Sequence, residues 1–164
     1  MKMHEIIPRL YVGGDEAVEE AKSRRFARLA VAKEGPDGHR HMLGYTTLGA
    51  PRGDNYFWAR DGDHMALNVI DMEDPGMIPD EALNRGLRFI REQYDAGKKT
   101  LVHCNAGHSR GPTLMMMFLR TIGELPDSFH RAEKIFRTLY PPYDPGTGMR
   151  THAHQRWSTL PKFR

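Results

Sequence analysis

The sequence predicts a single α/β domain over residues 1–164, with a central, mostly parallel sheet of about four or five strands flanked by helices. Short apolar runs that suit buried strands alternate along the chain with amphipathic segments that suit helices. A length of 164 residues is enough for one hydrophobic core. The hydrophobic fraction of 39% and the charged fraction of 27% are those of a globular protein rather than a disordered one.

The first part of the chain is predicted to run strand, helix, strand. Residues 5–14, EIIPRLYVGG, suit a short strand that the two glycines at its end terminate. Residues 15–25 suit a helix, because Asp15 can cap its start and acidic side chains follow in its first turn. Residues 26–32, FARLAVA, have the apolar character of a buried strand.

Residues 33–64 are predicted to form an irregular excursion, because they are rich in Gly, Pro and Asp. The aromatic run Tyr56, Phe57 and Trp58 suggests a hairpin within it. Large aromatic groups usually supply apolar contact area, so burial of this run is favoured over an exposed recognition hairpin. The chain returns to a strand at 65–71, and a loop follows.

Helices dominate the second half. A helix over 80–96, which Gly97 can end, is predicted by apolar side chains on one face; these are Leu83, Leu87, Ile90 and Tyr94. Residues 100–103, TLVH, suit a strand, and 112–123 suit a mostly buried helix that begins with a proline. A helix over 127–140 should turn these side chains inward: Phe129, Ala132, Ile135, Phe136 and Leu139. A short helix should close the chain.

Composition and charge argue against several function classes. The net charge is +3, and 24 Lys and Arg residues are scattered among 21 Asp and Glu, which is poor support for nucleic-acid binding. No apolar run approaches the roughly 20 residues of a membrane span. Because the first residues also lack a secretion signal and one cysteine cannot form an internal disulfide, we expect a cytoplasmic protein. We also expect it to be a monomer. The histidines of 39–41 and 152–154 are expected on the surface, with no metal or cofactor.

The segment LVHCNAGHSRGPT, residues 101–113, carries the predicted chemistry. A strand runs into a turn and then a helix, so that backbone N–H groups and the helix N-terminus can form one concavity for a phosphate-like dianion. Cys104, the only cysteine, lies at its base, where the same field favours the nucleophilic thiolate. Arg110 can hold two phosphoryl oxygens with its planar fork. Gly107 allows backbone geometry that a side chain would obstruct.

At these residues the chain resembles the cysteine-dependent phosphatases of the protein tyrosine phosphatase superfamily. Its HCxxGxxR signature is matched by His103, Cys104, Gly107 and Arg110, and HCNAGHSR is similar to the dual-specificity branch. EIIPRLYVGG, ALNVID and RFIREQYDAGKKTLVHC are similar to further family elements. The resemblance is good over 65–140 and poor over 33–64, and it implies a protein tyrosine phosphatase-like fold.

The resemblance also implies roles for the loop. Cys104 would be the nucleophile, Arg110 would stabilise charge on the phosphoryl group, and His103 would shape the loop and tune the thiolate through hydrogen bonds. The phosphate would be bound by Cys104, Asn105, Ala106, Gly107, His108, Ser109 and Arg110. We expect the Asn105 side chain to be mainly structural. For His108, a substrate contact and a solvated side chain remain equally open.

The family's general acid is an aspartate on a loop before the cysteine. NVIDMEDPG offers three acids, of which Asp71 is preferred because it directly follows the strand; Asp74 is the second candidate, and Glu73 the third acid. One residue departs from the family: Gly111 stands where a Ser or Thr usually assists departure of the sulfur. We therefore expect slow breakdown of the phosphocysteine, with Ser109 and Thr113 as the nearest alternative hydroxyls.

The predicted function is hydrolysis of phosphomonoesters on proteins, in two steps through a phosphocysteine. Phosphotyrosine is the expected substrate, and phosphoserine and phosphothreonine remain open. The expected partner is therefore a phosphorylated protein, with neither nucleic acid nor membrane. Two alternatives stay open: a catalytically weak relative that only binds phosphoproteins, and a phosphatase for a phosphoinositide or an RNA 5′-phosphate.

Overall fold

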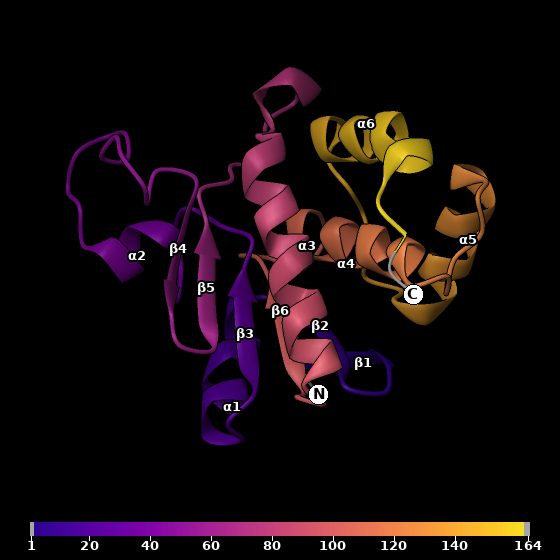
Figure 1. Ribbon diagram of the computed structural model, residues 1–164, viewed down its shortest axis with the longest axis horizontal. Coiled ribbons are helices and arrows are strands. Elements are labelled where there is room, and N and C mark those ends of the chain that lie inside the picture. Colours follow the sequence, from indigo (N-terminus) through magenta and orange to yellow (C-terminus); the bar gives the residue numbers. More distant parts are fainter. Residues whose placement is uncertain (1, 163–164) are drawn as a thin grey trace.

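A six-stranded sheet forms the centre of the computed structural model, which describes residues 2–162. Its strands are β1 (Met3–Ile7), β2 (Leu10–Gly13), β3 (Ala27–Ala30), β4 (Trp58–Asp61), β5 (His64–Leu67) and β6 (Thr100–His103). They lie in the order β1-β2-β6-β3-β5-β4 (Figure 1). The four central strands are parallel, and β1 and β4 run antiparallel to their neighbours. The mostly parallel α/β sheet is confirmed, with more strands than expected.

Both edge strands come from hairpins. The prediction of one strand over 5–14 is wrong, because the chain turns back at Pro8 and Arg9, the latter at φ 76°. Proline cannot donate to a strand ladder, so it suits the end of an edge strand. The predicted hairpin inside the excursion exists as β4 and β5, but it begins at Trp58, so that only the last of the three aromatic residues lies on a strand.

The helices lie close to their predicted positions, with one addition. They are α1 (Val18–Ser23), α2 (His39–Leu43), α3 (Asp80–Asp95), α4 (Arg110–Thr121), α5 (Phe129–Leu139) and α6 (Thr147–Arg156). Short 3-10 turns span Asp15–Ala17, Pro75–Met77 and Trp157–Thr159. The α2 helix is the addition, inside the excursion. Gly97, at φ +73°, follows the end of α3 as expected. Among the described residues, no helix is long and apolar enough to cross a membrane.

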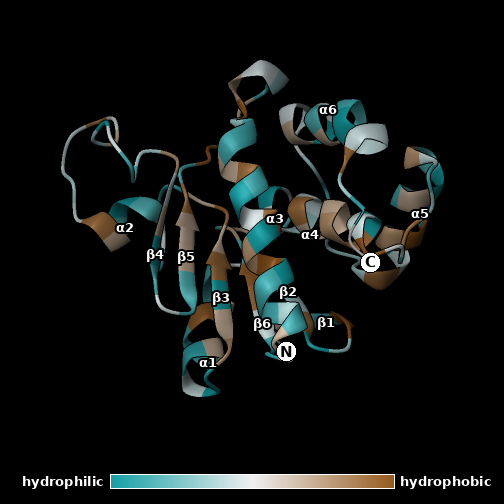
Figure 2. Cartoon of the chain, in the orientation of Figure 1, coloured by the Kyte–Doolittle hydropathy of each residue, from teal (hydrophilic) through white to brown (hydrophobic). Residues whose placement is uncertain are grey.

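Apolar clusters cover both faces of the sheet, because successive side chains of a strand point to opposite sides. Leu101 belongs to a small cluster that includes Ala17 and Ala21 beside α1, whereas Val102 belongs to the large cluster formed with α3 and α4. In Figure 1, α3 lies across the sheet, while α5 and α6 gather beyond α4. Figure 2 shows apolar residues on the central strands and along α4.

The three strands at the centre of the sheet end at one edge. Gly13 and Ala30 are both register partners of His103, so β2, β3 and β6 finish side by side. The segments that follow them, together with the one after β5, therefore meet at this edge. In open parallel sheets, ligands bind outside the carboxyl ends of the strands.

The inward face of α5 differs from the prediction by one side chain. Phe129, Ala132 and Phe136 are buried as expected, and Leu139 is half-buried. Ile135 instead lies at the edge of the apolar face and is 41% exposed. Residues adjacent in a helix are rotated by about 100°, so Ile135 cannot share the inward direction of Phe136.

This difference predicts unequal effects at two neighbouring positions of α5. Phe136→Ala should lower the free energy of unfolding by about 3–5 kcal/mol, because a fully buried ring leaves a cavity. Ile135→Ala should change it by less than about 1 kcal/mol. Urea unfolding of both variants measures the two values. Equal losses would show that Ile135 contributes to the core as fully as Phe136 does.

Candidate active site

Cys104 lies where β6 ends, at the carboxyl edge of the sheet. Its side chain belongs to the core, with only 2% of the residue exposed. Its backbone N–H donates to the carbonyl of Gly13 across the ladder, at 3.4 Å. Residues 105–109 then form an irregular loop that leads directly into α4. The structure thus has the strand, loop and helix that the sequence predicts.

The loop's backbone N–H groups remain available for a ligand. Among the described residues, none accepts a hydrogen bond from the amides of 105–109. Carbonyls of the same loop are occupied: that of Asn105 accepts from the amide of Asp15 at 2.9 Å, and that of His108 from the amide of Asp144 at 2.8 Å. Successive free amides at the N-terminus of a long helix are the backbone arrangement that binds oxyanions.

Arg110 begins α4, and its guanidinium is fixed by two hydrogen bonds. Nη1 donates to the carbonyl of Val69 at 3.0 Å, and Nη2 donates to Oδ1 of Asn105 at 2.7 Å. Nε is buried without a partner among the described residues. An arginine with a fixed orientation and an unused donor can bind an oxyanion without first being ordered.

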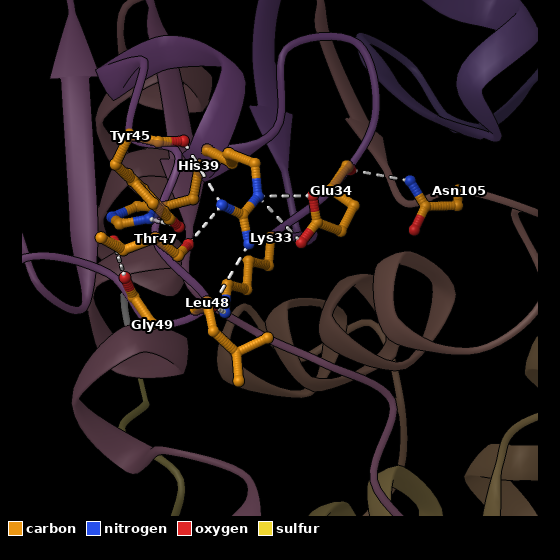
Figure 3. Close-up of polar contacts among 9 residues, drawn as sticks. Lys33, Glu34, His39, Tyr45, Thr47, Leu48, Gly49 and Asn105 are labelled. Carbon is orange, nitrogen blue, oxygen red and sulfur yellow. Dashed lines mark hydrogen bonds and ion pairs between the residues drawn. The ribbon is translucent and has the colours of Figure 1, made fainter.

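Asn105 connects the loop to two other segments, as its expected structural role requires. Its Nδ2 donates to the carbonyl of Glu34 at 2.9 Å and lies 3.3 Å from both carboxylate oxygens of Asp15 (Figure 3 shows the contact with Glu34). The prediction that Asp15 caps the following helix is wrong: Gly14 is the N-cap of the Asp15–Ala17 turn, Ala17 is the N-cap of α1, and the Asp15 side chain faces Asn105 instead. Burial raises the pKa of Asp15, against the smaller opposing effects of Asn105 and Arg110.

Two glycines allow this close approach between segments. A Cβ on Gly14 would lie 2.9 Å from the carbonyl oxygen of Asn105 and 3.0 Å from the carbonyl carbon of Ala106. Gly107 has φ +81°, and a Cβ there would lie 2.8 Å from the amide nitrogen of Gly14. Both positions exclude a side chain. The glycine pair Gly13 and Gly14 at the end of β2 therefore indicates two things: the end of a strand and, at Gly14, a close contact with the loop.

Tyr140 supports the loop from its other side. Its hydroxyl donates to the carbonyl of Gly107 at 2.6 Å, and its side chain is buried. Burial, followed by the negative charge of the nearby Cys104 and of Glu16, raises the pKa of Tyr140 to about 12. The phenol therefore stays protonated at neutral pH, which keeps it a hydrogen-bond donor to the loop. The sequence alone marked this residue only as a helix end.

The segment after Tyr140 makes three further contacts with the loop. The His108 ring is exposed, but its Nδ1 lies 2.9 Å from the carbonyl of Pro142. The amide of Gly146 donates to the Ser109 hydroxyl at 2.8 Å. With the Asp144 amide on the His108 carbonyl, these bonds place residues 140–146 against the loop.

His103 lies directly beneath the loop and is fully buried. The resemblance implied hydrogen bonds from its ring, but both ring nitrogens lack a partner among the described residues. Burial lowers its pKa to about 4, against the weaker opposing effect of the Asp37 carboxylate. The ring is therefore neutral at physiological pH.

Gly111 follows the arginine where the family usually has a hydroxyl. A Cβ at this position would lie 3.1 Å from the carbonyl carbon of His103 and 3.2 Å from the amide nitrogen of Cys104. A serine here would require the backbone to shift by a few tenths of an ångström. Neither alternative hydroxyl bonds to the sulfur: Ser109 faces Gly146, and Thr113 is buried without a partner among the described residues.

The candidate acids lie on the segment between β5 and α3. Asp71 is exposed and rests against Gly146, where a Cβ would lie 2.8 Å from Oδ1. Since Gly146 also bonds to Ser109, Asp71 stands next to a residue that touches the loop. Asp74 instead accepts the amide of Gly76 at 2.8 Å and caps the Pro75–Met77 turn. Glu73 is exposed. Asp71 is thus the acid placed beside the loop.

The two histidine-rich segments are not simply surface features. His39 is fully buried, with Nδ1 2.9 Å from the Tyr45 hydroxyl and Nε2 2.7 Å from the Asn55 carbonyl. His152 is also buried, and its Nε2 lies 2.9 Å from Asp80. The surface prediction is therefore wrong for these two residues. Within residues 2–162, no three His, Cys, Asp or Glu side chains form a group that could hold a metal ion.

Asn105 provides a test of how the loop is held. Asn105→Ala should lower the free energy of unfolding by about 1.5–3 kcal/mol, because it removes hydrogen bonds to charged groups. It should also weaken tungstate binding, measured by calorimetry, by about tenfold, because Arg110 loses one of its two anchors. Asn84→Ala is the matched control, since Asn84 accepts from Arg156 at the surface. The expectation fails if both variants behave alike.

His103 should make stability depend on pH. The unfolded chain takes up a proton at this residue near its ordinary pKa of 6.5, whereas the folded protein does so only near 4. Its contribution is therefore complete above pH 6.5 and is lost as pH falls, by about 3 kcal/mol in total. Urea unfolding at several pH values should show a shallower decline for His103→Leu than for the unchanged protein. His41→Leu, at an exposed position, should keep the original slope.

Comparison with known proteins adds to this geometry. No protein-family model matches the chain. Over 139 residues, 84% of its length, the chain is 30% identical to dual specificity protein phosphatase 12 of Mus musculus, and it spans 36% of that relative. Human DUSP28 has a TM-score of 0.65 and 18% identity, with 97% of this chain and 94% of that one covered.

A mouse putative dual specificity phosphatase complexed with zinc tungstate also has a TM-score of 0.65, at 18% identity, with 96% of this chain and 87% of that one covered. The solved structures share the fold, and the curated relative shares sequence over most of this chain. With the HCNAGHSR loop between strand and helix, these similarities lead to one conclusion. The chain is therefore similar in sequence to a dual specificity phosphatase, and it has the fold of solved dual-specificity phosphatase structures.

Proposed function

We propose that this chain hydrolyses phosphomonoesters on proteins, phosphotyrosine above all, through a phosphocysteine intermediate. The observation that carries the proposal is the set of unpaired amides at 105–109 beside Cys104 and a guanidinium anchored by two hydrogen bonds. Donors already oriented toward an oxyanion need no reorganisation when charge develops on it. Sequence similarity to dual specificity protein phosphatase 12 of Mus musculus supports the same proposal.

In the first step, the Cys104 thiolate attacks phosphorus, and the bond to the leaving oxygen breaks. Arg110 and the loop amides stabilise the charge on the three remaining phosphoryl oxygens. Asp71, protonated, gives its proton to the departing oxygen, so the product leaves as an alcohol or a phenol. The first step ends with phosphate on sulfur and an ionised Asp71.

In the second step, water attacks the phosphocysteine and Asp71 takes up its proton. The sulfur–phosphorus bond breaks, the thiolate is restored and inorganic phosphate is released. Since Gly111 offers no hydroxyl and Ser109 faces Gly146, the departing sulfur receives no side-chain hydrogen bond from these residues. Slow breakdown of the intermediate is therefore part of the proposal.

The loop's composition supports a protein substrate. The residues between Cys104 and Arg110 carry no lysine, and lysines in this loop would favour a lipid headgroup with several phosphates. The side-chain Nδ2 of Asn105 donates to Asp15 and Glu34 rather than to a ligand. A phosphorylated side chain presents a single dianion, which suits one guanidinium and a ring of amides.

Hydrolysis assays test this proposal and its choice of acid. We expect activity on p-nitrophenyl phosphate and on phosphotyrosine peptides, and its loss in Cys104→Ser. Asp71→Asn should lower kcat on phosphopeptides by about 10²–10⁴-fold, since their leaving groups need a proton. The loss should be smaller for p-nitrophenyl phosphate, whose leaving group departs without one.

Asp74→Asn is the matched control, because asparagine can also cap the Pro75–Met77 turn. If its loss exceeded that of Asp71→Asn, Asp74 would be the acid. A phosphoinositide and a 5′-phosphorylated RNA complete the panel, and faster hydrolysis of either would replace the substrate class. Tungstate binding without any turnover would make the chain a phosphate-binding relative instead of an enzyme.

A further inference from the structure

A hollow lies between the excursion and the acid-bearing segment, residues 68–79. Its volume is about 360 Å³, within the range of small ligand sites. The excursion supplies one wall, and residues 68–79 supply the other. The lining residues are Lys33, Gly49, Ala50, Tyr56, Phe57, Asn68, Ile70, Met72, Gly76, Met77 and Pro79.

The walls of this hollow are mostly apolar, and two of its polar side chains, Lys33 and Asn68, have hydrogen-bond partners within the protein. Lys33 donates through Nζ to the carbonyl of Leu48 at 2.7 Å. Asn68 donates through Nδ2 to the carbonyl of Tyr56 at 3.0 Å. The stem of a lysine contributes apolar surface even where its ammonium group is engaged. The hollow therefore suits an apolar group better than a polar one.

Two large apolar side chains of the lining remain exposed. Ile70 is 49% exposed and Met77 is 59% exposed. Both come from the acid-bearing segment, so one side of the hollow presents apolar surface to solvent. Apolar groups that gather at the mouth of a hollow, rather than singly on a surface, mark a binding surface. Methionine in particular adapts its shape to different apolar partners.

The excursion wall is held in place by ionic and hydrogen bonds. The Arg40 guanidinium bonds to the carboxylate of Glu34 at 2.8 Å and to the carbonyls of Thr47 and Leu48 at 2.6 and 3.2 Å. The Lys33 ammonium donates to the same Leu48 carbonyl, and Figure 3 shows Lys33, Glu34, Thr47 and Leu48 gathered at this wall. The segment before Gly49 is thus a supported part of the wall.

The hollow is continuous with the proposed phosphate site through the backbone. Lys33 lines it, and the next residue, Glu34, accepts the Asn105 amide group. Ile70 lines it, and the preceding residue, Val69, accepts Arg110. Lys33 and Ile70 are thus each one Cα–Cα step of about 3.8 Å from a residue that holds the loop. A group attached close to the bound phosphate can reach the hollow.

We propose that this hollow is a specificity subsite that receives a bulky apolar side chain of the substrate, close in sequence to its phosphorylated residue. The inference rests on the proposed function and adds a substrate class: phosphopeptides with a Leu, Met or Phe within about three residues of the phosphate. Three extended residues span about 10 Å, enough to reach from the loop to the lining. Burial of that side chain against Ile70 and Met77 supplies the selectivity.

A peptide series tests the subsite. Phosphotyrosine peptides in an alanine background carry Leu, Phe, Glu or phosphoserine at each position from three before to three after the phosphate. At one position, Leu or Phe should raise kcat/KM about tenfold over Ala. Met77→Ser should remove this preference by deleting apolar wall, and Ala50→Phe should remove it by filling the hollow. Ile135→Ser is the matched control, an exposed apolar residue on α5 that should keep the preference.

Three outcomes would overturn the subsite. The first is that Leu or Phe is preferred at no position, and the second is a preference for Glu or phosphoserine, which would identify the Lys33 ammonium as an anion site. The third is faster hydrolysis of a short-chain phosphoinositide than of every peptide. Binding of the same peptides to Cys104→Ser, followed by fluorescence anisotropy, separates this inference from the proposed function. If turnover is absent but Leu peptides bind more tightly than Ala peptides, the activity fails and the subsite stands. If both readouts ignore the apolar residue, the subsite fails whether or not the protein is an enzyme.

Discussion

Three amides of the 105–109 loop have a fixed orientation because the carbonyls that precede them are held by other segments of the chain. A trans peptide group directs its C=O and N–H in opposite directions, so fixing a carbonyl also orients the following N–H. The Asp15 amide fixes the carbonyl of Asn105, the Tyr140 hydroxyl fixes that of Gly107, and the Asp144 amide fixes that of His108. Unpaired donors are costly to maintain, and these external bonds keep the loop from rotating them toward internal acceptors.

The sheet makes those external bonds available at one place. Parallel strands finish at a common edge, so the chain that leaves β2 arrives beside the loop at Asp15, and the chain that leaves β3 arrives at Glu34. The chain leaving β5 arrives at Val69 and accepts Arg110. Residues 140–146 also support the loop, but this segment follows helix α5 rather than a strand of the sheet.

The sequence alone was enough for the parallel core and for the position of the loop between a strand and a helix, because both depend on local patterns. Apolar periodicity placed the helices, and one short motif placed Cys104, Gly107 and Arg110 between a strand and a helix. The residues that hold the loop could not be found in this way. Tyr140 acts through a hydroxyl on a distant carbonyl, and the carbonyls of Glu34 and Val69 act without regard to residue type. Contacts of this kind depend on the topology of the folded chain, which cannot be derived from local patterns in a single sequence.

The excursion that resembles the family least is tied to the part that resembles it most. The backbone carbonyl of Glu34 accepts a hydrogen bond from the Asn105 side chain, and its carboxylate binds the Arg40 guanidinium. One residue of the excursion thus connects the 105–109 loop to Arg40. The Arg40 ion pair is largely exposed on its acidic side and contributes little by itself. Its bonds to the carbonyls of Thr47 and Leu48 are what give the segment a defined path. Because a backbone carbonyl makes the connection to the 105–109 loop, side chains of the excursion can change while the geometry of that loop stays the same.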